Sequence, residues 1–188
     1  MKITLRKANA LQNTIQEHIK SIEVKTSIAL NEFQNAEGEV AVARGAVVVN
    51  DLIRAKLTKA LYAIRAKVGR ANVESGVSDL LTDAAYIDKR IGHLKGLTES
   101  KVAESGVVLE GKLDKLRNSD AKSRIYGYQD TVDTGVLTAD QIEGYKADMR
   151  SLKKEKQSIN DKVLELNVRT EIELDADTVA LLQTEQLV

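Results

Sequence analysis

The sequence contains no cysteine, no proline and no tryptophan, and only one phenylalanine among its 188 residues. Without cysteine the chain has no disulfide, no thiol nucleophile and no thiolate ligand for a metal. Because proline interrupts helices, its absence favours long, continuous helices. A core with so few aromatic rings must be built from leucine, isoleucine, valine and alanine, which is typical of helical bundles and coiled coils.

Long apolar runs and an excess of charge are also missing. No stretch approaches the ~18 apolar residues of a membrane span, and the opening MKITLRKANALQNTIQEH lacks the apolar region of a secretory signal. The 28 basic residues balance the 28 acidic ones, so bulk attraction to nucleic acid or to an anionic membrane is not expected. We therefore expect neither a nucleic acid nor a membrane as a partner.

The clearest pattern is a heptad repeat in LTADQIEGYKADMRSLKKEKQSINDKVLELNV, which begins at Leu137. Thr138 and Gln141 fit a capping box, in which each side chain accepts a hydrogen bond from the backbone N–H of the other residue. The a and d positions of four heptads are then apolar, with one lysine among them. This predicted seam, which we also interpret as an oligomerisation surface, consists of Ile142, Tyr145, Met149, Leu152, Lys156, Ile159, Val163 and Leu166.

Lys156 occupies an a position of this repeat, and two interpretations apply to it. In the first, its side chain lies at the edge of the seam, with the apolar stem on the seam and the ammonium group in water. In the second, the lysine fixes the register or the number of helices in an assembly, as polar residues at a positions do in coiled coils.

Three further amphipathic helices and one short helix are predicted. Ser78 is the expected N-cap of the third, and Asp79 suits the positive start of that helix. The short helix lies within ESGVVLEGKLDKLRNSDAKS, whose glycines mark its ends. The apolar faces of the three longer helices are Ala8, Leu11, Ile15, Ile19 and Ile22; Ile53, Leu57, Ala60, Ile64 and Val68; and Leu80, Ala84, Ile87, Ile91 and Leu94.

Three segments, SIEVKTSIALNEF, SRIYGYQDTVDTG and VRTEIELDADT, alternate in the manner of strands. A lone strand cannot satisfy its own backbone groups. The first, with apolar side chains near Val24 and Ile28, is therefore expected to pair with residues 170–174 or with residues 124–128. EVAVARGAVVV, from Glu39, is either a return strand of a hairpin or the beginning of a helix.

Charge is segregated along the chain although it cancels in total. Residues 52–70 carry no acidic side chain, and residues 171–188 carry no basic one. Either the two regions are solvated faces or partners within one chain, or the acidic and apolar tail at 171–188 docks on the basic helix of a neighbouring subunit. The residues of this predicted charged docking surface are Arg54, Lys56, Lys59, Arg65, Lys67, Arg70, Glu171, Glu173, Asp175 and Asp177.

Two long segments of the chain resemble a family of helical, coiled-coil proteins of bacteria and phages known as septicolysins. These segments are IRAKVGRANVESGVSDLLTDAAYIDKRIGHLKGL and TVDTGVLTADQIEGYKADMRSLKKEKQSINDKVLELNVRTEIEL. The chain departs from the family in EVAVARGAVVV and in an insertion over residues 98–123. The resemblance implies a helical, oligomer-prone protein and transfers no active site. The matching residues are Asn72, Leu81, Thr82, Asp83, Ala84, Thr131, Val132, Asp133, Asn167 and Thr170.

Residue patterns that carry chemistry are scarce. His18 and His93 have no second ligand at a metal-binding spacing, so we interpret each as a surface or core-edge residue. DTVDTG and ELDADT gather acidic residues without the spacing of an EF-hand loop, and turns explain them better. The sequence has no glycine-rich phosphate loop and no recognisable Ser-His-Asp arrangement. We predict no enzyme, no metal and no cofactor.

These observations predict a mainly α protein, an antiparallel helical bundle with a long heptad C-terminal helix and a small accessory β-sheet. We treat residues 1–188 as a single helical domain in which residues 171–188 form a docking tail. The expected function is structural, in a homo-oligomer or a larger assembly. The resemblance implies that this assembly is a bacteriophage virion, with other virion proteins as partners, in which the chain is a decoration, neck or tail-associated protein. We therefore expect the protein in the virion or in the host cytoplasm. The alternative, which the resemblance implies, is a membrane-active, pore-forming toxin.

Overall fold

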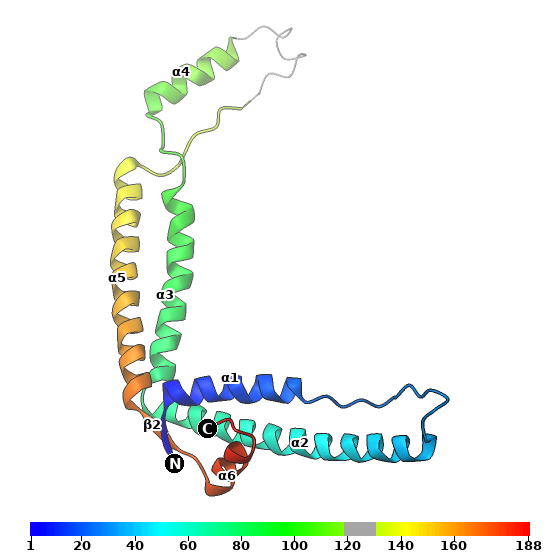
Figure 1. The fold of residues 1–188 in the computed structure, drawn as a ribbon. Coiled ribbons are helices and arrows are strands. Elements are labelled where there is room, and N and C mark those ends of the chain that lie inside the picture. The colour runs from blue at the N-terminus through cyan, green and yellow to red at the C-terminus, as the bar shows by residue number, and fades with distance from the viewer. Residues whose placement is uncertain (119–130) are drawn as a thin grey trace. The chain divides into compact units, whose positions relative to one another are not determined.

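The computed structural model describes residues 1–118 and 131–188 (Figure 1). Within them the protein is mainly α-helical with one small sheet, which confirms the predicted fold class. The elements in chain order are β1 (Lys2–Thr4), α1 (Leu5–Ser21), α2 (Ala36–Glu74), α3 (Val77–Thr98), α4 (Gly106–Arg117), α5 (Ala139–Arg169), β2 (Glu171–Glu173) and α6 (Ala176–Thr184).

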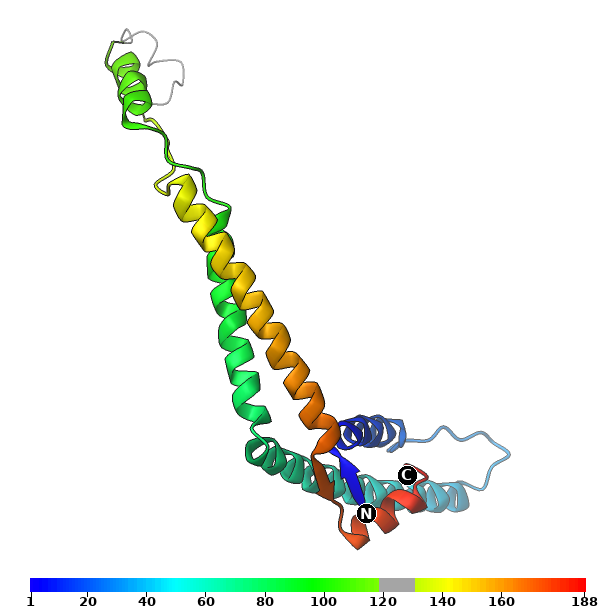
Figure 2. The ribbon, with the colours of Figure 1, turned by 90° about the vertical axis from the view of Figure 1, so that its left-hand side faces the viewer.

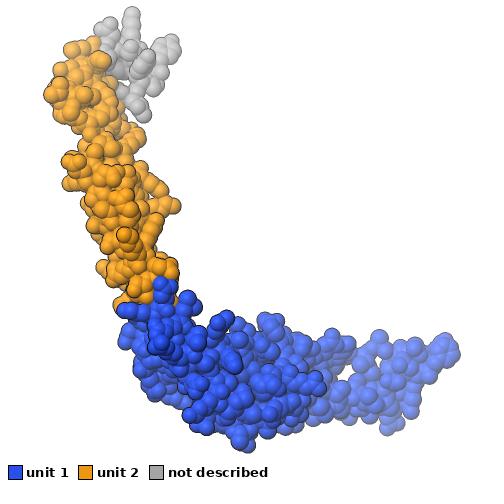
Figure 3. Space-filling model, turned by 60° about the vertical axis from the view of Figure 1, so that its left-hand side comes forward, with its two compact units in different colours: residues 1–81, 161–188 blue, residues 82–160 orange. Residues whose placement is uncertain are grey.

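The chain forms two compact units, although the sequence analysis treated it as one domain. Unit 1 consists of residues 1–81 and 161–188, and unit 2 consists of residues 82–160 (Figure 3). Unit 2 is therefore an insertion in the sequence of unit 1. Each unit is built around a pair of antiparallel helices, α1 with α2 in unit 1 and α3 with α5 in unit 2 (Figures 1 and 2).

The helices of unit 1 begin where the sequence supplies caps. The side chain of Thr4 accepts a hydrogen bond from the backbone N–H of Lys7 at 3.3 Å and so caps α1. Asn35 caps α2 in the same way, and Glu37 and Glu39 lie in its first turn, where negative charge is favourable. The segment EVAVARGAVVV, which the sequence left ambiguous, is thus the beginning of α2.

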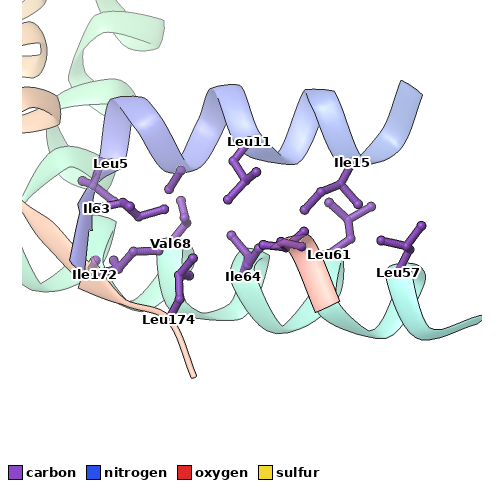
Figure 4. Close-up of a cluster of buried hydrophobic side chains, with 13 residues drawn as sticks. Ile3, Leu5, Leu11, Ile15, Leu57, Leu61, Ile64, Val68, Ile172 and Leu174 are labelled. Atoms are coloured by element: carbon purple, nitrogen blue, oxygen red, sulfur yellow. The ribbon is translucent and has the colours of Figure 1, made fainter. Parts of the chain in front are cut away.

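The core of unit 1 lies between α1 and α2, and α6 and the sheet add to it (Figure 4). The apolar faces predicted for the two helices are confirmed, because the buried residues recur every three or four positions on both. Burying each such Leu, Ile or Val side chain contributes about 1.5–3 kcal/mol. The cluster consists of Ile3, Leu5, Ala8, Leu11, Ile15, Leu57, Leu61, Ile64, Val68, Ala71, Ile172, Leu174 and Leu182.

The partner of the predicted C-terminal strand differs from the expected one. β2 pairs antiparallel with β1, in a register that places Ile3 opposite Ile172, and both side chains enter the core. The expectation that the segment around Val24 forms a strand is wrong, since residues 22–35 contain no strand. Its alternating side chains stay exposed, as Ile28 does, so pairing would bury no apolar face. The other expected partner, residues 124–128, lies outside the described residues.

The link between α2 and α3 corrects the predicted cap of α3. This helix begins at Val77, so Ser78 lies inside it and is not its N-cap. The chain turns at Gly76, whose φ of 78° is in the left-handed region that glycine adopts without strain. The backbone N–H of Leu80 then donates to the carbonyl of Gly76 at 3.1 Å, which continues the helical hydrogen bonding.

In unit 2 the capping box at the beginning of α5 is confirmed. The backbone N–H of Gln141 donates to Thr138 Oγ1 at 3.2 Å, and the N–H of Thr138 donates to Gln141 Oε1 at 2.9 Å. Just before it, Val102 and Leu137 form a parallel bridge. Gly135 lies so close to this bridge that a Cβ atom built on Gly135 would stand 1.9 Å from the carbonyl oxygen of Lys101. The predicted short helix is α4.

Candidate assembly surfaces

The predicted heptad seam runs along α5. Ile142 and Ile159 are buried, and the other six seam residues are half-buried. On α3, Ala84, Ile87 and Leu94 are buried at the spacing of three and four that the sequence predicted. The two helices lie side by side in both ribbon views, so in unit 2 the seam of α5 faces α3 of the same chain (Figures 1 and 2).

Lys156 forms an ion pair across this helix pair. Its Nζ atom donates to both carboxylate oxygens of Asp88 on α3, at 2.5 and 2.7 Å. Counting outward from this ion pair along two antiparallel helices places Ala84 at the level of Ile159 and Leu94 at the level of Met149. The half-buried side chain of Lys156 and the exposed Asp88 agree with a lysine at the edge of the seam, and a register-fixing role for Lys156 stays a prediction.

The basic region of α2 and the acidic tail also meet within one chain. Lys67 Nζ donates to Asp175 Oδ1 at 2.7 Å and to the carbonyl oxygen of Glu173 at 2.8 Å. The hydrogen bond from Lys67, and after it the positive charge, hold the pKa of the Asp175 carboxyl below its ordinary value. Asp175 also stands at the N-cap position of α6, so this contact joins α2 to the beginning of that helix.

Other predicted docking residues surround this contact or lie elsewhere on unit 1. Lys56, Lys59, Asp175 and Asp177 line an open groove between α2 and α6, together with Ala60 and Leu181. Arg65 extends toward α1 instead and donates to Gln16 Oε1 at 3.3 Å. Its guanidinium group also lies over the ring of Tyr62, which is on α2 itself. Two of the others, Arg54 and Arg70, lie on α2, and Glu171 and Glu173 are exposed residues of β2.

The apolar residues of the tail pack on unit 1. Leu182 on α6 is fully buried, and Val179, Leu181 and Leu187 pack against the same core. His18 Nε2 lies 3.1 Å from Glu185 Oε2, which joins the end of α1 to the residue after α6. Of the two alternatives for the tail, the structure therefore contains the contact within one chain. The contact with a neighbouring subunit stays a prediction.

One exposed surface was missed by the sequence analysis. The first half of α2, residues 36–56, contains no buried residue, whereas the second half supplies six. Its exposed small and apolar residues follow one another at spacings of one and three, which places them on one side of the helix. The pattern in EVAVARGAVVVNDLIRA was sufficient to predict this exposed side from the sequence. We call this surface the α2 apolar face: Ala41, Val42, Gly45, Val48, Val49, Leu52 and Ala55.

Metal-binding clusters and membrane-spanning helices are absent from the described parts of the chain. No group of three or more His, Asp or Glu residues among residues 1–118 and 131–188 is placed to hold a metal ion. In the same residues no helix combines the length and the apolar character needed to cross a bilayer. Of the two histidines, His18 has the contact with Glu185 and His93 is exposed, beside an open surface hollow with Asp88 and Lys89.

No protein-family model, no curated protein and no solved structure matches this chain. The resemblance to septicolysins drawn from the sequence therefore stays a prediction.

Proposed function

We propose that this protein is a structural component that assembles into a homo-oligomer or a larger complex and catalyses no reaction. The observation that carries the proposal is the α2 apolar face. Val42, Val48 and Leu52 are 72, 63 and 54% exposed, although they stand within one continuous helix. Contiguous exposed apolar surface on a folded chain marks sites of association with other molecules.

The length of α2 supports the same conclusion. A helix gains most of its stability in a protein from tertiary packing, and isolated helices are marginal in water. The first half of α2 has its cap and favourable charges, but among the described residues it packs only lightly on its own chain. Ile53 packs against the core of unit 1, and Asn50 Nδ2 donates to the carbonyl of Glu23 at 2.8 Å in the extended segment before the helix. A partner that covers the α2 apolar face would supply the missing packing.

Within this class we propose a bacteriophage virion component, such as a decoration, neck or tail-associated protein. The support for this finer proposal is the resemblance of the segments around Asn72 and Thr131 to a family found in bacteria and phages. Its test is the gene neighbourhood: adjacent capsid or tail genes support it, and a neighbourhood of metabolic genes contradicts it.

Light scattering after size-exclusion chromatography tests the proposal that the protein assembles. We expect a discrete multiple of the chain mass of 20.6 kDa at low and high salt, since apolar contacts are not screened by ions. A monomer at every concentration and salt would contradict self-assembly. Leakage of dye-loaded liposomes at micromolar protein would contradict the structural role and favour the membrane-active alternative.

A further inference from the structure

The α2 apolar face also indicates which partner the protein binds and in which orientation. We propose that the α2 apolar face binds the same face of a second copy, with the two α2 helices antiparallel and a two-fold axis near Val48. This inference rests on the proposed function. A contact of this kind is isologous, so the same residues serve both copies and the assembly closes as a dimer.

The shape of the face suits a helix as its occupant. Ala41, Gly45 and Ala55 have little or no side chain, and Val48 and Leu52 stand between them, all exposed. A Cβ atom built on Gly45 would meet nothing within 4 Å, so its own chain leaves this place open. Small residues let two helix backbones approach closely, and the valines and leucine then fill the space between them, as knobs do in coiled coils.

The charges around the face decide the orientation. The first turn of α2 is acidic, and residues 54–70 of the helix carry only basic charges, with one arginine and one aspartate between these two regions. In a parallel pair each charged residue would stand beside the same residue of the second copy, and the two like charges would repel. In an antiparallel pair centred on residues 47–48 opposite charges meet, which favours this partner and this register. The opposed pairs that lie on or beside the face are Glu37 with Lys59 and Arg44 with Asp51.

Two independent patterns give the same centre. The apolar face extends from Ala41 to Ala55, and its midpoint is Val48. The midpoints of the two pairs of opposite charges lie at residues 48 and 47.5. Nothing in the folding of one chain requires these two midpoints to coincide, because the charges are exposed and the apolar residues are not part of the core. A two-fold axis near Val48 requires the two midpoints to coincide.

Cysteine cross-linking tests the orientation directly, because the chain has no cysteine of its own. We would mix Ala41→Cys with a size-tagged Ala55→Cys variant, oxidise them and separate the products without reductant. Positions 41 and 55 are symmetric about Val48, so in the proposed dimer unlike positions meet. Like positions would lie about 21 Å apart along the helix, which exceeds the reach of a disulfide. Mixing Ala41→Cys with Val73→Cys, an exposed site outside the face, is the matched control.

Dominant cross-linking of the unlike pair in the mixture, with little in either variant alone or in the control, is the expected result. Equal or stronger cross-linking of like positions would overturn the antiparallel arrangement. An oligomer by light scattering with no cross-link would overturn the α2 interface but leave the proposed function standing. A monomer with no cross-link would overturn both the α2 interface and self-assembly. Circular dichroism confirms that each variant keeps its helices.

Charge reversal gives a second, independent readout. Arg44→Glu and Asp51→Arg each place like charges together across the proposed axis, so each should weaken the dimer, with a Kd raised several-fold at low salt. The double variant restores both pairs with opposite polarity and should recover most of the affinity. Additive weakening in the double variant would show that the two residues do not face each other between copies.

Discussion

Replacing Ile64 by alanine should destabilise unit 1 by about 3–4 kcal/mol. The side chain is 1% exposed and lies in the core between α1 and α2 (Figure 4). The substitution removes three carbon atoms, each worth about 0.8 kcal/mol of burial, and the cavity left between two helices adds to that cost. With an unfolding entropy of about 2 cal/mol/K per residue, the melting temperature of a unit of this size should fall by roughly 14–18 °C.

The assay is urea unfolding followed by circular dichroism at 222 nm, with the slope m compared between variants. Val73→Ala is the matched control, because Val73 lies on the same helix and is 68% exposed, so its free energy of unfolding should change by at most about 0.5 kcal/mol. A loss below about 1 kcal/mol for Ile64→Ala at unchanged m would refute the packing of α1 on α2 as described here.

Three further predictions concern local contacts. Thr138→Ala removes one side of the capping box of α5 and should cost about 0.5–2 kcal/mol of stability in urea unfolding, with Ser in its place nearly neutral. Gly135→Ala should disrupt the strand bridge beside it, because its Cβ would overlap the carbonyl of Lys101; normal amide exchange of Ala103 in this variant would contradict that. Lys67 lowers the pKa of Asp175, so this contact stabilises the fold above the unfolded pKa of about 3.9 and is lost as pH falls through the lower folded value. Asp175→Asn should therefore be less stable than wild type at pH 7, and the difference should shrink as pH falls through the folded pKa of Asp175. A difference that stays constant from pH 7 into the acid range would contradict the assignment.

The helices were predictable because their signals are local. The capping box at Thr138 and the three-four spacing around Ile64 and Ile87 depend on neighbours within one or two turns of the chain. Strand pairing is not local: β1 has three residues and contributes one buried residue, Ile3, and no pattern in so short a segment identifies β2 as its partner. The predicted beginning of α3 was wrong because Gly76 ends the preceding turn with a backbone conformation that the sequence does not reveal.

The candidate surfaces were predictable as patterns but not as contacts. The heptads of α5 identify residues that need an apolar partner, and the basic and acidic segments identify residues that need opposite charge. A partner in the same chain and a partner in another copy satisfy these needs by identical chemistry, so the sequence left both open. The structure places α3 against the seam and Asp175 against Lys67. The residues of the α2 apolar face stay exposed among residues 1–118 and 131–188.

The insertion of unit 2 in the sequence of unit 1 has a consequence for synthesis on the ribosome. The chain makes α1 and α2 first, but Ile172, Leu174 and Leu182, which complete the same core, follow only after residues 82–160. At roughly 5–20 residues per second this interval lasts about 4–16 s. During it the nascent α1–α2 pair exposes apolar surface that the finished protein covers, and a chaperone that binds there would act before any copy becomes competent to assemble.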